Sequence, residues 1–238
     1  VHSLWQGALL GLAAALTLRA MARAIAGLRH NVAMVFLLAM ALAPAEHFLR
    51  LLLSDAPIDD GLLRALALPF AFIGESDGFP VAAAVVLSWL FGVSLMLTRN
   101  AAGLGVIAAM ERGSHQSLPV AWRQRVDDLR RALGIARDVA VRLSDSVPAP
   151  CTARLMRPVI WLPLSMLTRL PPAQLEALLA HELAHIARKD WLWNGVQRAI
   201  ESMLFFHPAV WWCSRRVRIE REMCCDELAA TALNDRTG

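Results

Sequence analysis

The chain of 238 residues is 57% hydrophobic, with a mean hydropathy of +0.46 and a formal net charge of +4. This composition is too apolar for an ordinary soluble domain and is typical of a chain embedded in a membrane. The positive surplus lies in the second half of the chain. It fits a surface close to anionic lipid but is too small to indicate nucleic acid binding, so we expect no direct nucleic acid partner.

Three apolar stretches are long enough to cross a bilayer as helices, namely 4–22, 31–49 and 79–98. The first is not a signal peptide, because Arg19 and Arg23 follow the apolar run and do not precede it. The link between the first two spans is basic, whereas the loop 46–79 is mostly acidic. The positive-inside rule therefore predicts that the N-terminus and this loop lie outside and that the later part of the chain is cytoplasmic.

Two segments near these spans allow more than one interpretation. The run 61–68 within the acidic loop predicts an amphipathic helix on the membrane surface, with a short fourth span as the competing interpretation. The apolar character of the third span continues past Arg99 to Met110. The span therefore either extends or bends at Gly103 and Gly105.

From Pro119 onward the sequence changes to that of a soluble domain. Periodicity and turn signals predict strands at 139–143 and 159–162, and helices at 122–133, 175–188, 191–205 and 209–233. We therefore predict a mainly α, polytopic membrane protein with a membrane domain at 1–112 and a small α+β domain at 113–238. We expect a fragment, truncated at its C-terminus, because the chain starts without Met and stops within a helical pattern.

The predicted helix 175–188 contains the motif H-E-x-x-H, formed by His181, Glu182 and His185. Residues i and i+4 share a helix face, so the two imidazoles can bind one metal ion. Glu182 then lies roughly 100° round the helix, beside the metal, where a zinc peptidase has its general base. The alternative is that both histidines are ordinary core residues.

A candidate third ligand follows in the pattern E-x-x-x-D, formed by Glu222 and Asp226. A catalytic Zn²⁺ needs three protein ligands and an open position, so Glu222 can complete the set with one zinc per chain. Asp226, one turn on, can accept the second ring N–H of a ligand histidine. Asp190 is expected at a helix end, as a residue that supports a ligand without binding the metal itself. Alternatively, both carboxylates of the E-x-x-x-D pattern are ordinary charges on a solvated helix surface. The four cysteines are expected to be reduced thiols.

Substrate binding is predicted on the strand before the motif helix. Val159, Ile160 and Trp161 would form an edge strand that pairs with an extended peptide, and an ordinary core strand is the alternative. The oxyanion of the reaction needs a donor besides the metal. Because the chain has no Tyr, His207 or one of Arg215, Arg216 and Arg218 is the candidate.

Several of these segments together resemble the BlaR/MecR family of membrane zinc metallopeptidases. The resemblance covers nearly the whole chain and rests on His2–Gln6, Arg157–Pro163, His181–His185, Arg188–Asp190, Asn194, Phe206–Trp212 and Glu220–Asp226. Arg154 departs from the family pattern, which usually has a small residue there. This departure puts the local strand geometry in doubt but not the zinc site.

The resemblance implies a gluzincin-like zincin domain, with His181, His185 and Glu222 as zinc ligands, in a multi-pass protein of the bacterial inner membrane. It implies a β-lactam sensor-transducer and antirepressor that cleaves itself and inactivates a transcriptional repressor. A second copy of the chain, in a homodimer, is a further candidate partner. One alternative is a quality-control protease of the more distantly similar HtpX type. Another is a non-catalytic transducer in which zinc is structural.

Overall fold

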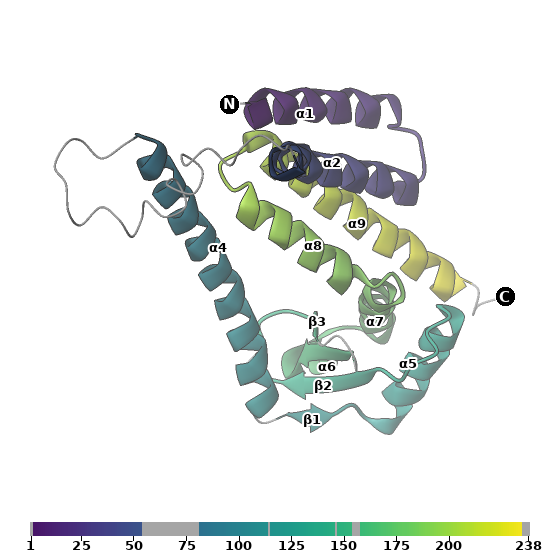
Figure 1. Ribbon diagram of the computed structural model, residues 1–238. Coiled ribbons are helices and arrows are strands. Elements are labelled where there is room, and N and C mark those ends of the chain that lie inside the picture. The colour runs from purple at the N-terminus through teal and green to yellow at the C-terminus, as the bar shows by residue number, and fades with distance from the viewer. Residues whose placement is uncertain (1, 54–80, 114, 146, 154–157, 235–238) are drawn as a thin grey trace.

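The computed structural model describes residues 2–53, 81–113, 115–145, 147–153 and 158–234 (Figure 1). The predicted surface helix 61–68, Arg154 and the C-terminal end lie outside these residues. The helices are α1 (His2–Ala20), α2 (Ala26–Leu53), α4 (Val81–Arg112), α5 (Val120–Ala132), α6 (Leu164–Arg169), α7 (Pro172–Ala187), α8 (Asp190–Met203) and α9 (Pro208–Asn234). The strands are β1 (Gln116–Ser117), β2 (Ala140–Ser144), β3 (Cys151–Ala153) and β4 (Val159–Pro163).

The helices and strands predicted after Pro119 are confirmed to within a few residues. Helices α5, α7, α8 and α9 and strands β2 and β4 all occur where periodicity placed them. The prediction missed β1, β3 and α6, which have two, three and six residues. Elements this short do not complete enough periods for a hydrophobic pattern to show.

The described residues contain two helical stretches that are long and apolar enough to cross a membrane, Ala26–Pro44 in α2 and Ala84–Arg112 in α4. The apolar part of α1 is shorter, so the predicted span at 4–22 stays a prediction. Helix α4 runs without a break through Gly103 and Gly105, which decides for extension over bending. Helix α2 also continues through Pro44, into the segment predicted to be loop.

The four strands form one sheet in the order β1-β2-β4-β3. Strands β2 and β4 are parallel, and β1 and β3 join them antiparallel at the two edges. All five residues of β4 are buried, which fits the continuous apolar run expected of an inner strand. The predicted edge strand at Val159–Trp161 is therefore wrong, because both sides of its backbone are already paired inside the sheet.

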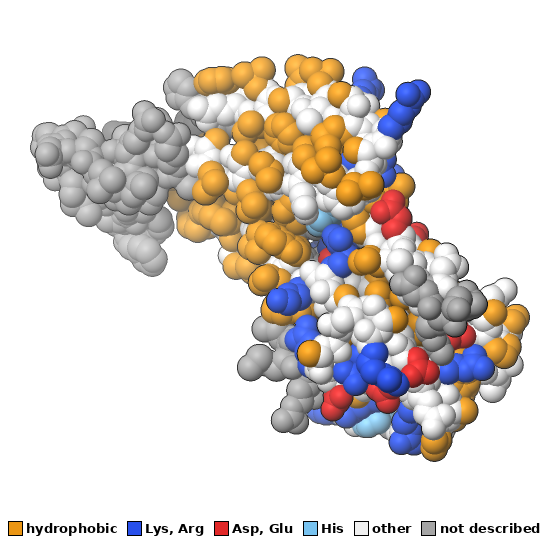
Figure 2. Space-filling model, turned by 90° about the vertical axis from the view of Figure 1, so that its right-hand side faces the viewer, with side chains coloured by type: hydrophobic (Ala, Val, Ile, Leu, Met, Phe, Trp, Pro, Cys, Tyr) orange, Lys and Arg blue, Asp and Glu red, His pale blue; other side chains and the backbone are white. Residues whose placement is uncertain are grey.

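Among the described residues, two larger apolar cores lie in the upper and the lower group of elements in Figure 1, beside a small third cluster around Trp161. The lower core lies between the sheet, α5 and α7, whereas the upper core is built from α1, α2, α8 and α9. Helix α9 contributes to both, through Ala229 below and Val210, Cys213 and Val217 above. Figure 2 shows the corresponding surface, with hydrophobic side chains gathered over the upper part and charged ones over the lower part. The upper core thus crosses the domain boundary predicted at residue 112, and that boundary stays a prediction.

An ion pair between α2 and α9 lies under the upper core. The Glu220 side chain is 1% exposed, and its two oxygens lie 2.9 Å from Arg29 Nε and 2.7 Å from Arg216 Nη2. Arg29 also donates to the Ala22 carbonyl oxygen. A buried carboxylate needs such partners, because removing one partner of a buried pair typically costs about 3–5 kcal/mol.

Helix α1 packs closely on the start of α9 through small residues. A Cβ atom on Gly11 would lie 2.7 Å from that of Ala209, and a Cβ on Gly7 would overlap the ring of His207. The Ala209 N–H donates to Nδ1 of His207, so Nε2 carries the proton and donates to the Leu4 carbonyl oxygen at 3.1 Å. His207 is 5% exposed and is fixed on both sides by these hydrogen bonds.

The Gly7 contact gives a test of this packing. Gly7→Ala should lower the free energy of unfolding by about 1–3 kcal/mol, because the buried His207 ring has no room to retreat. Gly27→Ala is the matched control, since nothing lies within 4 Å of its added methyl and alanine favours a helix. Thermal unfolding of the detergent-purified proteins measures both. Equal stability of the two variants would contradict the close contact of α1 with α9.

Candidate metal centre

The position of α7 follows from its apolar face. The helix begins after Pro171, with Pro172 in its first turn, where a missing N–H costs nothing. Leu175, Leu179 and Leu183 recur at intervals of four residues and are all buried in the lower core. This burial fixes the rotation of α7 about its axis and leaves His181 and His185 half-buried on a face that α9 covers.

Three side chains converge where α7 meets α9. Oε2 of Glu222 lies 3.5 Å from Nε2 of His181 and 3.5 Å from Nε2 of His185. Zinc bonds of about 2.0–2.2 Å in a tetrahedral arrangement place neighbouring ligand atoms about 3.3 Å apart. The donor set and its spacing therefore fit a zinc ion.

Two further carboxylates hold the outer nitrogens of the histidines. Asp226 Oδ1 lies 2.9 Å from Nδ1 of His181, and Asp190 Oδ2 lies 2.8 Å from Nδ1 of His185. A neutral ring that donates through Nδ1 presents an unprotonated Nε2, which is the form that binds a metal. The predicted outer residues Asp190 and Asp226 thus lie where they orient the two histidines.

The three carboxylates change the acid–base behaviour of this cluster. Hydrogen bonds from His181 and His185 hold the pKa of Glu222 well below its usual range. Burial opposes protonation of His185, but its hydrogen bonds to Asp190, Cys225 and Glu222 outweigh burial and raise its pKa to about 12. The pKa of His181 is also raised, first of all by Glu222. The cluster therefore favours a cation between these side chains. A metal ion that binds there would displace protons from His181 and His185.

The turn between α7 and α8 brings Asp190 back to His185. Lys189 adopts the left-handed conformation with φ 58° and ψ 39°, and α8 starts at the next residue. Arg188 Nε also lies 3.4 Å from Asp190 Oδ1 and balances the charge of this carboxylate. A left-handed lysine has no clear sequence signal, because this conformation is mostly taken by Gly and Asn.

Sequence reasoning missed Cys225 as part of this cluster. Its Sγ lies 3.2 Å from His185 Nδ1 and 3.3 Å from Asp190 Oδ2, so the thiol adds to the hydrogen bonds around the same ring nitrogen. His185, Asp190 and Cys225 could also hold an ion, but their contacts use the outer nitrogen of His185. Cys225 lies three residues after Glu222, a helical spacing that could have indicated a shared face. All four cysteines are free thiols, as expected.

Glu182 lies beside the cluster and contacts the sheet. Its side chain is 8% exposed, and its Oε2 accepts a hydrogen bond of 2.8 Å from the Thr152 hydroxyl. Thr152 is the middle residue of the edge strand β3. Only the tertiary fold brings these residues together, since 30 positions separate them in the sequence.

The other predicted site residues are placed elsewhere. His207 lies at the α1–α9 contact, directly before α9 begins at Pro208 and fifteen residues before Glu222, so it is about 22 Å away along the helix axis. His207 is too far from the cluster to stabilise an oxyanion there, so the predicted catalytic role of His207 is wrong. Arg216 and Arg218 bind Glu220 and Glu201, whereas Arg221, which was not proposed, lies 3.6 Å from Glu222.

The chain is similar to known proteins. Residues 8–237 match the family described as BlaR1 peptidase M56. The chain is 25% identical over 158 residues to the regulatory protein BlaR1 of Bacillus licheniformis, covering 65% of this chain and 26% of the relative. It is 21% identical over 150 residues to the methicillin resistance mecR1 protein of Staphylococcus aureus (strain Mu50 / ATCC 700699), covering 63% and 26%. The matches thus span about a quarter of the length of these relatives.

The Asp190 contact predicts the effect of an outer residue on metal affinity. Asp190→Asn should weaken Zn²⁺ binding by roughly 10–100-fold, because His185 loses the carboxylate that orients it. The control is Asp138→Asn, which removes the same charge from a fully exposed side chain. Competition with a chromogenic chelator measures both dissociation constants. Unchanged affinity in Asp190→Asn would show that Asp190 does not support the metal site.

Proposed function

The chain belongs to the BlaR1 peptidase M56 family, and on that basis we propose that it is a membrane-embedded zinc endopeptidase that hydrolyses peptide bonds. The observation that carries this proposal is the convergence of His181, His185 and Glu222, with the Glu182 carboxylate on the next helix position. A structural metal site needs no such carboxylate, whereas a hydrolytic site needs a general base.

His181, His185 and Glu222 would hold the zinc ion. When bound, zinc supplies Lewis-acid polarisation of the scissile carbonyl and lowers the pKa of water. Because Asp226 and Asp190 fix the two rings through Nδ1, the ligand nitrogens are oriented before the ion arrives. This orientation reduces the conformational cost of assembling the site.

Glu182 acts as the general base in this proposal. It takes a proton from the attacking water and passes it to the leaving amine. The Thr152 hydroxyl holds Oε2, and among the described residues Oε1 has no hydrogen-bond partner, so this oxygen can accept the proton. The low exposure of the carboxylate keeps bulk water from competing for it.

The substrate would be a protein or peptide in extended form. Strand β3, and not β4, is the edge of the sheet on the side of Glu182. Its outer backbone groups can pair with an extended segment by adding a strand to the sheet. Pairing there would bring the scissile bond close to Glu182, because Thr152 of β3 contacts this residue directly.

The names of two relatives support a proposed biological role. One is named a regulatory protein and the other a methicillin resistance protein. We therefore propose a role in signal transduction and antibiotic resistance at the bacterial inner membrane, with the N-terminus outside and the peptidase part cytoplasmic. Self-cleavage, inactivation of a transcriptional repressor in response to a β-lactam, and a homodimer belong to this proposal.

Two alternatives give different outcomes in the test. A quality-control protease of the HtpX type would cleave many misfolded membrane proteins, not one repressor and itself. A non-catalytic transducer with structural zinc would bind the metal and cleave nothing. The Glu182 carboxylate beside the ligands argues against the second alternative.

Metal content and self-cleavage of purified variants test the assigned roles. The wild type and Glu182→Ala should each hold about one zinc per chain, and Glu222→Ala should lose it. Cleavage should fall by roughly 10²–10⁴-fold in Glu182→Ala, since proton transfer then has no positioned base. Zinc retained in Glu222→Ala would exclude this residue as the third ligand. Full cleavage by Glu182→Ala would exclude it as the base.

A matched pair of variants tests the contact between β3 and the base. Thr152→Val keeps the shape of the side chain but removes the hydroxyl, so kcat should fall roughly 10–100-fold while zinc content is unchanged. Thr152→Ser keeps the hydroxyl and should retain most of the activity. The comparison needs a peptide substrate and separate values of kcat and KM. Equal rates in both variants would mean that the hydrogen bond does not position Glu182.

A further inference from the structure

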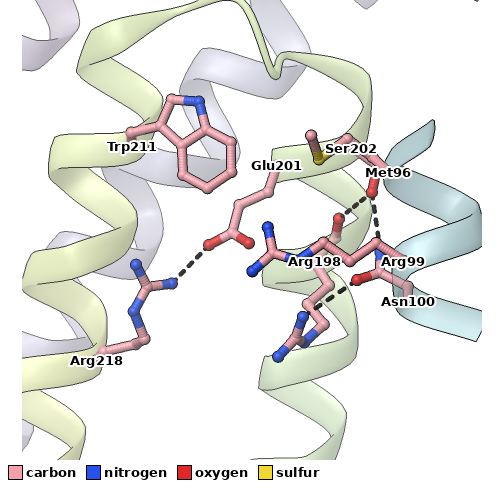
Figure 3. Close-up of a pocket in the computed structure, with 8 residues that line it drawn as sticks. All are labelled: Met96, Arg99, Asn100, Arg198, Glu201, Ser202, Trp211 and Arg218. Atoms are coloured by element: carbon pink, nitrogen blue, oxygen red, sulfur yellow. Dashed lines mark hydrogen bonds and ion pairs between the residues drawn. The ribbon is translucent and has the colours of Figure 1, made fainter. Parts of the chain in front are cut away.

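A cavity of about 260 Å³ lies away from the metal centre, between α4, α8 and α9. Figure 3 shows the side chains that line it, coming from all three helices. Six of them carry a charged, amide or hydroxyl group, namely Arg99, Asn100, Arg198, Glu201, Ser202 and Arg218. No part of the peptidase chemistry proposed above uses this cavity.

The charges around the cavity do not balance. Arg99, Arg198 and Arg218 face a single carboxylate, that of Glu201. Arg218 pairs with Glu201, because its Nη1 lies 2.7 Å from Oε1, and the Ser214 hydroxyl donates to the same oxygen. Two guanidinium groups therefore remain without an anionic partner among the described residues.

The two unbalanced arginines are nevertheless directed into the cavity. Arg198 Nη1 donates to the Asn100 amide oxygen at 3.1 Å, and the Asn100 amide donates to Ser202 Oγ at 3.1 Å. Arg99 reaches from α4 toward the side of the cavity where Glu201 lies (Figure 3). Each guanidinium has five N–H donors in a planar fork, so both keep donors for an oxyanion.

The location of Arg99 makes an unbalanced charge costly. It lies within Ala84–Arg112, the stretch of α4 that is apolar and long enough to cross a membrane. Its neighbours Leu95 and Leu97 are each 55% exposed, so this surface of α4 suits acyl chains. An arginine in such a segment normally faces a partner or a water-filled cavity. An intramembrane arginine without an anionic partner therefore points to a bound ligand.

We propose that the cavity between α4, α8 and α9 binds a phosphate group, held by Arg99 and Arg198. Phosphate oxygens match the fork of a guanidinium and form charge-assisted hydrogen bonds with it. The same chemistry is offered by a phospholipid headgroup and by a free phosphate ion. The exposed apolar surface beside Arg99 favours the lipid, whose chains would lie along α4.

Three probes separate these sources, each titrated into the full chain in detergent. Dioctanoyl phosphatidylglycerol has both phosphate and chains, inorganic phosphate has no chains, and dioctanoylglycerol has no phosphate. A lipid site binds only the first in a saturable way, whereas a site for a free anion binds inorganic phosphate at least as tightly. Dioctanoylglycerol binding as tightly as the phospholipid, or no saturable binding of any probe, would overturn the proposal.

Matched variants then locate the site. Arg99→Gln and Arg198→Gln should each weaken binding of the effective probe roughly tenfold or more, since each removes charge-assisted hydrogen bonds. Arg215→Gln on α9 is the control, because it removes the same charge from an exposed arginine outside the cavity. Zinc content, measured in every variant, reports whether the fold is intact. Equal affinity in all three variants would place the binding elsewhere and contradict the proposal.

Discussion

The buried ion pair of Glu220 with Arg29 and Arg216 fixes α9 against α2, and the rest of the structure depends on the position of α9. Removing one guanidinium from a carboxylate this deeply buried is strongly destabilising, so the contact tolerates little sliding of one helix on the other. The same helix forms the upper core with α1, α2 and α8 and then packs on α7. The candidate metal site lies at that second contact.

The helical parts of the site could be predicted from the sequence, because helix geometry is local. The i, i+4 spacing of His181 and His185, and the same spacing of Glu222 and Asp226, already places each pair on one face. Asp190 was also found, because it follows the motif by little more than one turn. The structure brings all five side chains together, and their distances suit the proposed ligand set.

The predictions that failed concern contacts between segments that are distant in the sequence. Strand order cannot be read from periodicity, so the sequence predicts β4 as an edge strand although β3, only three residues long, covers it. Thr152 could not be found for the same reason, since it meets Glu182 only through that pairing. His207 was misplaced because a histidine before a proline gives no indication of its partner. Its partner proved to be the backbone of α1.

The continuity of α9 has a mechanical consequence. Its 27 residues form a rod about 40 Å long, which touches α1 at one end and supplies Glu222 toward the other. A rod transmits an axial displacement without loss, and one residue of helix corresponds to about 1.5 Å. Zinc coordination tolerates only about 0.2 Å in each ligand distance. A displacement of α9 along its axis by a fraction of a helical step would therefore be enough to separate Glu222 from His181 and His185, so the contact of α9 with α1 and the position of this carboxylate are mechanically linked.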